Sequence, residues 1–161
     1  ALAGDFTWRV VAYSETGDIT LTGDSVNLAG SALSDYGNTA DGLVASTGGT
    51  ATVTIGTGHT DGLYGSVAIA IGAEGARVES GSASTTGDQG VVLYAGSENG
   101  DALVISGSIE MTGVRGAGID SIADNGVATV ESGTITGAGP SSWSLRATSR
   151  RPAPLRSTCG A

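Results

Sequence analysis

The sequence predicts an all-β fold, a parallel β-helix (β-solenoid) of about five to six coils followed by an irregular tail. A unit of about 26 residues recurs between Gly75 and Gly139, which is typical of repeat architectures. Apolar residues alternate with polar ones, which indicates strands. Glycine accounts for 28 of the 161 residues and interrupts any helical pattern. Three short strands cannot bury both of their faces alone, so we expect successive coils to stack at the strand spacing of about 4.8 Å.

Three columns of glycines define the repeat, and we expect them to form its corners because glycine adopts positive φ angles without strain. The columns are Gly75, Gly100 and Gly126, then Gly81, Gly107 and Gly133, then Gly87, Gly113 and Gly139. One copy, from Gly75 to Gly81, is shorter than the others. Pairs such as Asp41-Gly42, Asp61-Gly62 and Asn99-Gly100 favour turns. Each copy is therefore predicted to contain about three short strands and three corners.

The elements before the regular repeat can be justified in chain order. Alternation of Phe6, Trp8 and Val10 predicts a strand whose bulk closes the first coil. Residues 17–23 form a second strand bounded by glycines. Aligning Gly17 and Gly23 with Gly49 and Gly56 requires an inserted loop of about seven residues around Ser25–Tyr36. The alternative keeps a spacing of 26 through Gly4, Gly30 and Gly56 without an insertion.

From Gly49 onward each copy holds matching segments. A valine stands three residues before each glycine of the second column, at Val53, Val78, Val104 and Val130. A further apolar run precedes each copy, in residues 42–46, 63–71, 90–95 and 116–122. These runs are short and bounded by glycine, so they predict additional strands.

The chain is predicted to divide into repeats over residues 1–139 and an irregular or disordered tail over residues 140–161. The tail holds all three prolines, the only cysteine and four of the seven Lys and Arg residues, and it lacks the repeat. Trp143 is expected to fold over the last coil as a cap. The second interpretation is that residues 140–161 are a non-native ending, which the coding DNA would decide.

The charge of the chain excludes several classes of partner. Residues 1–139 contain 16 carboxylates and three arginines, 3 − 16 = −13, whereas the tail carries four arginines and no carboxylate. An acidic body disfavours binding to nucleic acid or to anionic lipid. A single Cys159 excludes an internal disulfide framework, and no apolar stretch is long enough for a transmembrane helix. The start, Ala1-Leu2-Ala3, matches the end of a signal cleavage site.

Several residues are of types that take part in catalysis. Paired carboxylates suited to glycan cleavage are available as Asp120 with Asp124 and as Asp41 with Asp61. Most acidic residues, however, precede glycine at corners, where a turn explains them. His59 has no nucleophile in a recognisable motif, so it is interpreted as a polar loop residue. No catalytic, cofactor-binding or metal-binding residue is predicted.

Recurring serine, threonine and Asp-Gly positions are candidates for binding. Ser80, Ser106 and Ser132 precede the second glycine column, and they are interpreted as corner residues rather than as a row that binds a polymer. Threonine pairs at 20 and 22, 50 and 52, and 134 and 136 do not share one column, which disfavours an ice-binding face. Calcium is compatible with stacked Asp-Gly corners, but the GGxGxD motif is absent, and Gly116–Asp120 only faintly matches it.

The copies Asp101–Gly113 and Val127–Gly137 resemble the passenger repeats of bacterial autotransporters, and β-helical adhesins of the filamentous haemagglutinin type share the pattern. The resemblance covers residues 40–139 and implies a right-handed parallel β-helix that is displayed at the outer surface of a bacterium or secreted. Because the chain is much shorter than such passengers, we expect a fragment or a free β-helical unit.

These observations lead to two expectations of function. The first is a structural and adhesive segment without catalysis, whose partners are host or bacterial surfaces, glycans or copies of itself, and which neither binds nucleic acid nor inserts into a membrane. The alternative is a carbohydrate-active or carbohydrate-binding β-helix related in kind to polysaccharide lyases and hydrolases. A groove that brings two carboxylates and a base together would favour the alternative.

Overall fold

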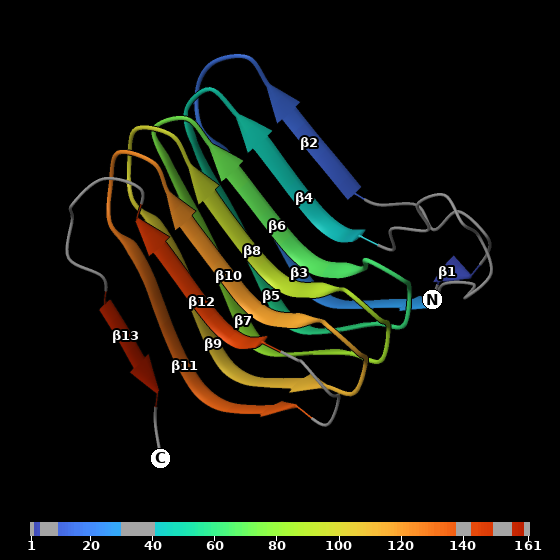
Figure 1. Cartoon of the computed structure of the whole chain (residues 1–161). Coiled ribbons are helices and arrows are strands. Elements are labelled where there is room, and N and C mark those ends of the chain that lie inside the picture. The colour runs from blue at the N-terminus through green and yellow to red at the C-terminus, as the bar shows by residue number, and fades with distance from the viewer. Residues whose placement is uncertain (1, 4–9, 30–40, 138–142, 150–155, 160–161) are drawn as a thin grey trace.

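The computed structural model describes residues 2–3, 10–29, 41–137, 143–149 and 156–159. These residues form an all-β solenoid of two parallel sheets, as predicted (Figure 1). The solenoid has about four turns, fewer than the five to six predicted. Residues 30–40 lie outside the described part. The right-handed winding stays a prediction.

The strands alternate between a sheet of long strands and a sheet of short ones. The long-strand sheet contains, in spatial order, β1 (Leu2–Ala3), β3 (Ile19–Ala29), β5 (Thr50–Thr60), β7 (Gly75–Thr85), β9 (Ala102–Met111), β11 (Ala128–Gly137) and β13 (Arg156–Cys159). The short-strand sheet contains β2 (Val10–Ser14), β4 (Asp41–Thr47), β6 (Ser66–Gly72), β8 (Val91–Ser97), β10 (Ala117–Ala123) and β12 (Trp143–Ser149). The apolar runs before each repeat are the strands β4, β6, β8 and β10, as predicted.

Each coil holds two strands rather than the three predicted, because the long strand bends without ending. In β7 and β9 the pairing runs from Ser80 with Ser106 to Ser82 with Ser108, on both sides of Gly81. Figure 1 shows this bend in the long strands. One predicted corner is therefore a bend within a continuous strand, and Asp41-Gly42 lies inside β4 instead of at a corner.

The core is built from identical residues stacked in columns. Val53, Val78, Val104 and Val130 are register partners and are completely buried. The columns persist because β5 pairs with β7 at an offset of 25 residues, and β7 pairs with β9 at 26. A stacked coil thus covers the inward side chains of its neighbours, as the sequence predicted.

The glycine columns exist for lack of space rather than for positive φ angles, which corrects the expectation. Among the described glycines only Gly17 has a positive φ, of 85°. A Cβ on Gly81 would instead lie 2.6 Å from the carbonyl oxygen of Gly56 in the adjacent coil. The first column is also shifted by one, because Glu74 rather than Gly75 stands between Gly49 and Gly100.

Part of the loop predicted around Ser25–Tyr36 is strand. Gly23 pairs with Ile55, one residue before the predicted Gly56, and Ser25 to Leu28 continue β3 beside β5. Residues 25–29 are therefore strand, and the rest of the predicted loop lies outside the described residues. β2 forms the first described strand of its sheet, where Val10 is 56% exposed although its register partner Leu43 is buried. Phe6 and Trp8 lie outside the described part.

The backbone continues the solenoid beyond Gly139, although the sequence repeat does not. β12 pairs with β10 and β13 pairs with β11, both parallel and in register. The segment is therefore not irregular throughout. Trp143 begins β12, and its side chain lies outside the described part, so its capping role stays a prediction, as does the division at residue 139.

Candidate binding face

The second halves of the long strands, after the bend, present two rows of polar side chains to solvent. We call this surface the hydroxyl face. Its first row is Ser25, Thr57, Ser82, Ser108 and Thr134, and its second is Asn27, His59, Ser84, Glu110 and Thr136. The strands alternate strictly here, so the intervening residues face the core. Neighbouring side chains of one row lie about 4.8 Å apart, the strand spacing.

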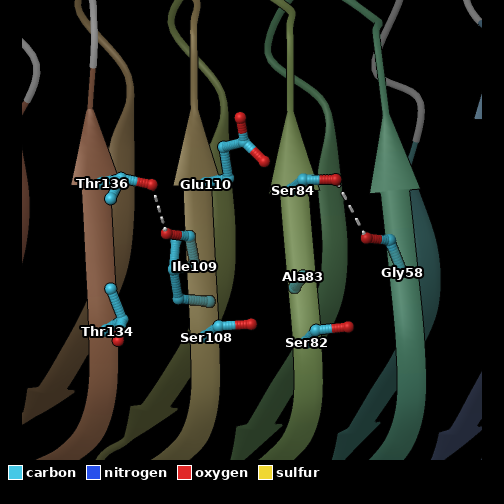
Figure 2. A pocket seen from close by; sticks show the side chains of 9 residues that line it. All are labelled: Gly58, Ser82, Ala83, Ser84, Ser108, Ile109, Glu110, Thr134 and Thr136. Carbon is cyan, nitrogen blue, oxygen red and sulfur yellow. Dashed lines mark hydrogen bonds between the residues drawn. The ribbon is translucent and has the colours of Figure 1, made fainter.

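A shallow depression of about 220 Å³ lies on this face, over β5, β7, β9 and β11 (Figure 2). Ser82 and Ser108 point out from neighbouring strands, while Ala83 and Ile109 lie behind the ribbon and are buried. Among the described residues, no side-chain hydrogen bond engages Ser82, Ser108 or Thr134. These hydroxyl groups are available to a partner as both donors and acceptors.

The second row is held in place by hydrogen bonds between adjacent coils. His59 Nδ1 lies 2.8 Å from Ser84 Oγ, and Ser84 Oγ lies 3.4 Å from the carbonyl oxygen of Gly58. Thr136 Oγ1 donates in the same way to the carbonyl oxygen of Ile109, at 3.3 Å. These contacts orient the side chains before a partner arrives, which lowers the entropy lost on binding.

His59 lies on β5, so its interpretation as a loop residue is wrong. Its contact with Ser84 was missed because the two residues are 25 apart in the chain. The repeat length would have found the pair, because it places Ser84 one coil after His59. Among the described residues no carboxylate bonds the other ring nitrogen of His59. The pair therefore lacks the third group that orients the base in a catalytic triad.

The candidate carboxylates occupy different places in the coils. Asp120 lies on β10, is 8% exposed, and precedes Asp124 by four residues. Asp124 lies in the corner that follows β10, so the two residues belong to different elements of the coil. Asp41 pairs with Ser66, while Asp61 lies in the corner after β5, so they occupy different register positions.

Several corner carboxylates have a structural role. The carboxylates of Asp18, Asp88 and Asp101 each accept a hydrogen bond from a backbone N–H of the next coil, at 2.8 Å. The donors are Thr50, Val114 and Val127. Arg77 is likewise engaged, because it forms an ion pair with Glu79 on the same strand. The three aspartates therefore link adjacent coils, whereas the Arg77–Glu79 pair lies within one strand.

The other sequence candidates can be placed as well. Ser80, Ser106 and Ser132 are buried at the bend within the long strands rather than at a corner, and the hydroxyl groups of Ser106 and Ser132 lie 2.9 Å apart. Threonines 20 and 22 pair with threonines 52 and 54, and the next coil carries Arg77 and Glu79 there. No regular threonine face results. Within the described ranges, no group of three or more acidic, histidine or cysteine residues could hold a metal ion.

Comparison of the chain with protein-family models, with curated proteins and with solved structures finds no match. In the part of the chain that the structure describes, no helix is long and apolar enough to cross a membrane.

Proposed function

We propose that this chain is a structural and adhesive segment of a bacterial surface or secreted protein, and that it binds its partner through the hydroxyl face. The observation that supports this proposal is the alignment of outward polar side chains across five adjacent strands. A flat, regular array of this kind suits contact with an extended partner. Binding sites for small molecules, by contrast, are usually concave and largely apolar.

The chemistry of the face defines the partners that it fits. Its hydroxyl groups form hydrogen bonds with sugar hydroxyls or with polar groups of another protein. The formal charge of −9 disfavours polyanions, nucleic acid included. The proposed partners are host or bacterial surfaces, their glycans, or copies of the chain itself. The proposed location is extracellular, as the resemblance to bacterial passenger repeats implies.

The proposal is tested by removing the first row of hydroxyl groups. The triple variant Ser82→Ala, Ser108→Ala, Thr134→Ala removes three hydroxyl groups that have no described partner in the protein. A matched control, Thr52→Ala with Thr54→Ala and Thr129→Ala, removes hydroxyl groups from the outward side of the same sheet before the bend. Adhesion of the purified chain to bacterial and epithelial cells is expected to fall at least tenfold in the first variant and to be unchanged in the control.

Two results would overturn the proposal. One is equal adhesion by both triple variants, which would remove the hydroxyl face from the binding site. The other is the release of reducing or unsaturated sugar ends from a polysaccharide by the purified chain, because this would favour the alternative of a carbohydrate-active enzyme.

A further inference from the structure

The corners that follow β5, β7 and β9 contain an unusual backbone conformation. The chain turns there through residues 61–65, 86–90 and 112–116 before the next short strand begins. In each turn the fourth residue has a left-handed backbone: φ is 57° at Tyr64, 59° at Gln89 and 62° at Arg115. No other non-glycine residue in the described part has a positive φ. These three residues, one coil apart, form what we call the corner ridge.

The fold alone would favour glycine at these positions. A left-handed backbone is unfavourable for residues with a side chain, and bulky residues are rare there. The chain does use glycine in the same turns, but where coils approach closely: a Cβ on Gly90 would lie 2.6 Å from the carbonyl oxygen of Gly65. The ridge residues instead carry large exposed side chains, and Tyr64 is 45% exposed. Strain of this kind gathers at functional sites.

The three side chains together suit a sugar chain. The ring of Tyr64 offers an apolar face and a hydroxyl group, Gln89 offers an amide donor and acceptor, and Arg115 offers several N–H donors. Exposed Asp88 directly precedes Gln89, and the chain has a net charge of −9, which disfavours an anionic polymer. We propose that the corner ridge is a binding site for a neutral glycan chain.

The ridge borders the hydroxyl face, so one ligand can contact both. Four residues separate Ser84 from Gln89, and four separate Glu110 from Arg115. Between them Thr86 and Thr112 are exposed, which continues the polar surface up to the corner. The inference rests on the proposed adhesive function, because it names the class of molecule that the adhesive surface holds.

The left-handed backbone provides a test in which stability and binding change in opposite directions. Tyr64→Gly, Gln89→Gly and Arg115→Gly each relieve the backbone strain but remove the side chain. Each variant of the full chain is expected to unfold at the same or a higher temperature than the wild type. The dissociation constant for a neutral polysaccharide, measured by calorimetry with dextran, glucomannan and arabinoxylan, is expected to rise at least tenfold in Tyr64→Gly.

The control is Glu74→Gly, an exposed position at another corner whose column neighbours Gly49 and Gly100 are already glycine. It is expected to bind each polysaccharide like the wild type. The inference is overturned if the ridge variants bind like the wild type, or if binding and melting temperature fall together, because the side chains would then be structural. It is also overturned if the wild type binds none of the three polymers, or binds polygalacturonate more tightly.

The two proposals fail in different ways. If the hydroxyl-face triple variant loses adhesion to cells while the ridge variants bind polysaccharide like the wild type, the adhesive function stands and the ridge inference falls. If the ridge variants lose polysaccharide binding while the hydroxyl-face variant adheres like the wild type, the hydroxyl face is the wrong adhesive surface and the glycan site stands.

Discussion

The substitution Gly81→Ala tests whether the glycine columns are set by the distance between coils. Its Cβ would lie 2.6 Å from the carbonyl oxygen of Gly56, whereas ordinary contacts begin at 3.4 Å. The two coils would have to separate locally by 3.4 − 2.6 = 0.8 Å. Added to a hydrogen bond of about 2.9 Å, this gives a donor–acceptor distance of about 3.7 Å, beyond the range of a hydrogen bond.

The loss of stability follows from the hydrogen bonds at the bend. Losing two to four of them, at about 1 kcal/mol each, costs about 2–4 kcal/mol. Alanine recovers about 0.4–1 kcal/mol because it restricts the unfolded chain more than glycine does. We therefore expect Gly81→Ala to lower the free energy of unfolding by about 2–3 kcal/mol, measured by urea unfolding followed by circular dichroism.

Gly75→Ala is the matched control. The nearest atom to its Cβ would be Thr50 Cγ2, a side-chain atom at 3.3 Å, so a small rotation accommodates the methyl group. Its free energy of unfolding is expected to stay within about 1 kcal/mol of the wild type. If both variants lose the same stability, or neither loses any, the coil spacing does not determine the glycine columns.

Three further predictions use the same unfolding measurement. Asp101→Ala removes the carboxylate that accepts from the Val127 N–H, and it should cost about 1–2 kcal/mol, with Asp101→Asn closer to the wild type. Ser80→Ala should be neutral or stabilising, because its buried hydroxyl group has no hydrogen-bond partner among the described residues, whereas Ser106→Ala should lose about 1 kcal/mol; equal effects would contradict this. Ile109→Ala should lose about 2–5 kcal/mol, and a smaller loss would show that the core collapses around the site.

The solenoid could be predicted because its information is repeated. A single alternation of apolar and polar residues leaves a strand ambiguous, but Val53, Val78, Val104 and Val130 stand at one position in four consecutive copies. Stacking is the arrangement that buries all four together, so both the fold class and the inward columns followed from the sequence. The weakest prediction concerned residues 24–48, where no second copy constrains the alignment.

The causes of the glycine columns could not be predicted from spacing alone. A glycine recurs equally well where φ is positive and where a neighbouring backbone leaves no room for a Cβ, and only the structure separates the two. The left-handed positions Tyr64, Gln89 and Arg115 could not be predicted from the sequence either, because the three residues differ in type and form no visible column. Contacts between coils, such as that of His59 with Ser84, can be found only when the offset of 25 residues between paired strands is known.

Glycines that make room between coils and residues with a left-handed backbone occupy different positions in this fold. This difference makes the side chains of the corner ridge candidates for a role in binding. In a fold whose glycines relieve close contacts between coils, a left-handed residue that keeps a large side chain gains nothing from the packing. Tyr64, Gln89 and Arg115 have exposed side chains, so replacing them relieves strain without emptying space in the core. The adjoining hydroxyl face behaves similarly, because Ser82 and Ser108 make no side-chain hydrogen bond within the described part. Substitutions on both surfaces should therefore change binding while the solenoid remains folded, which makes adhesion and glycan affinity direct tests of function.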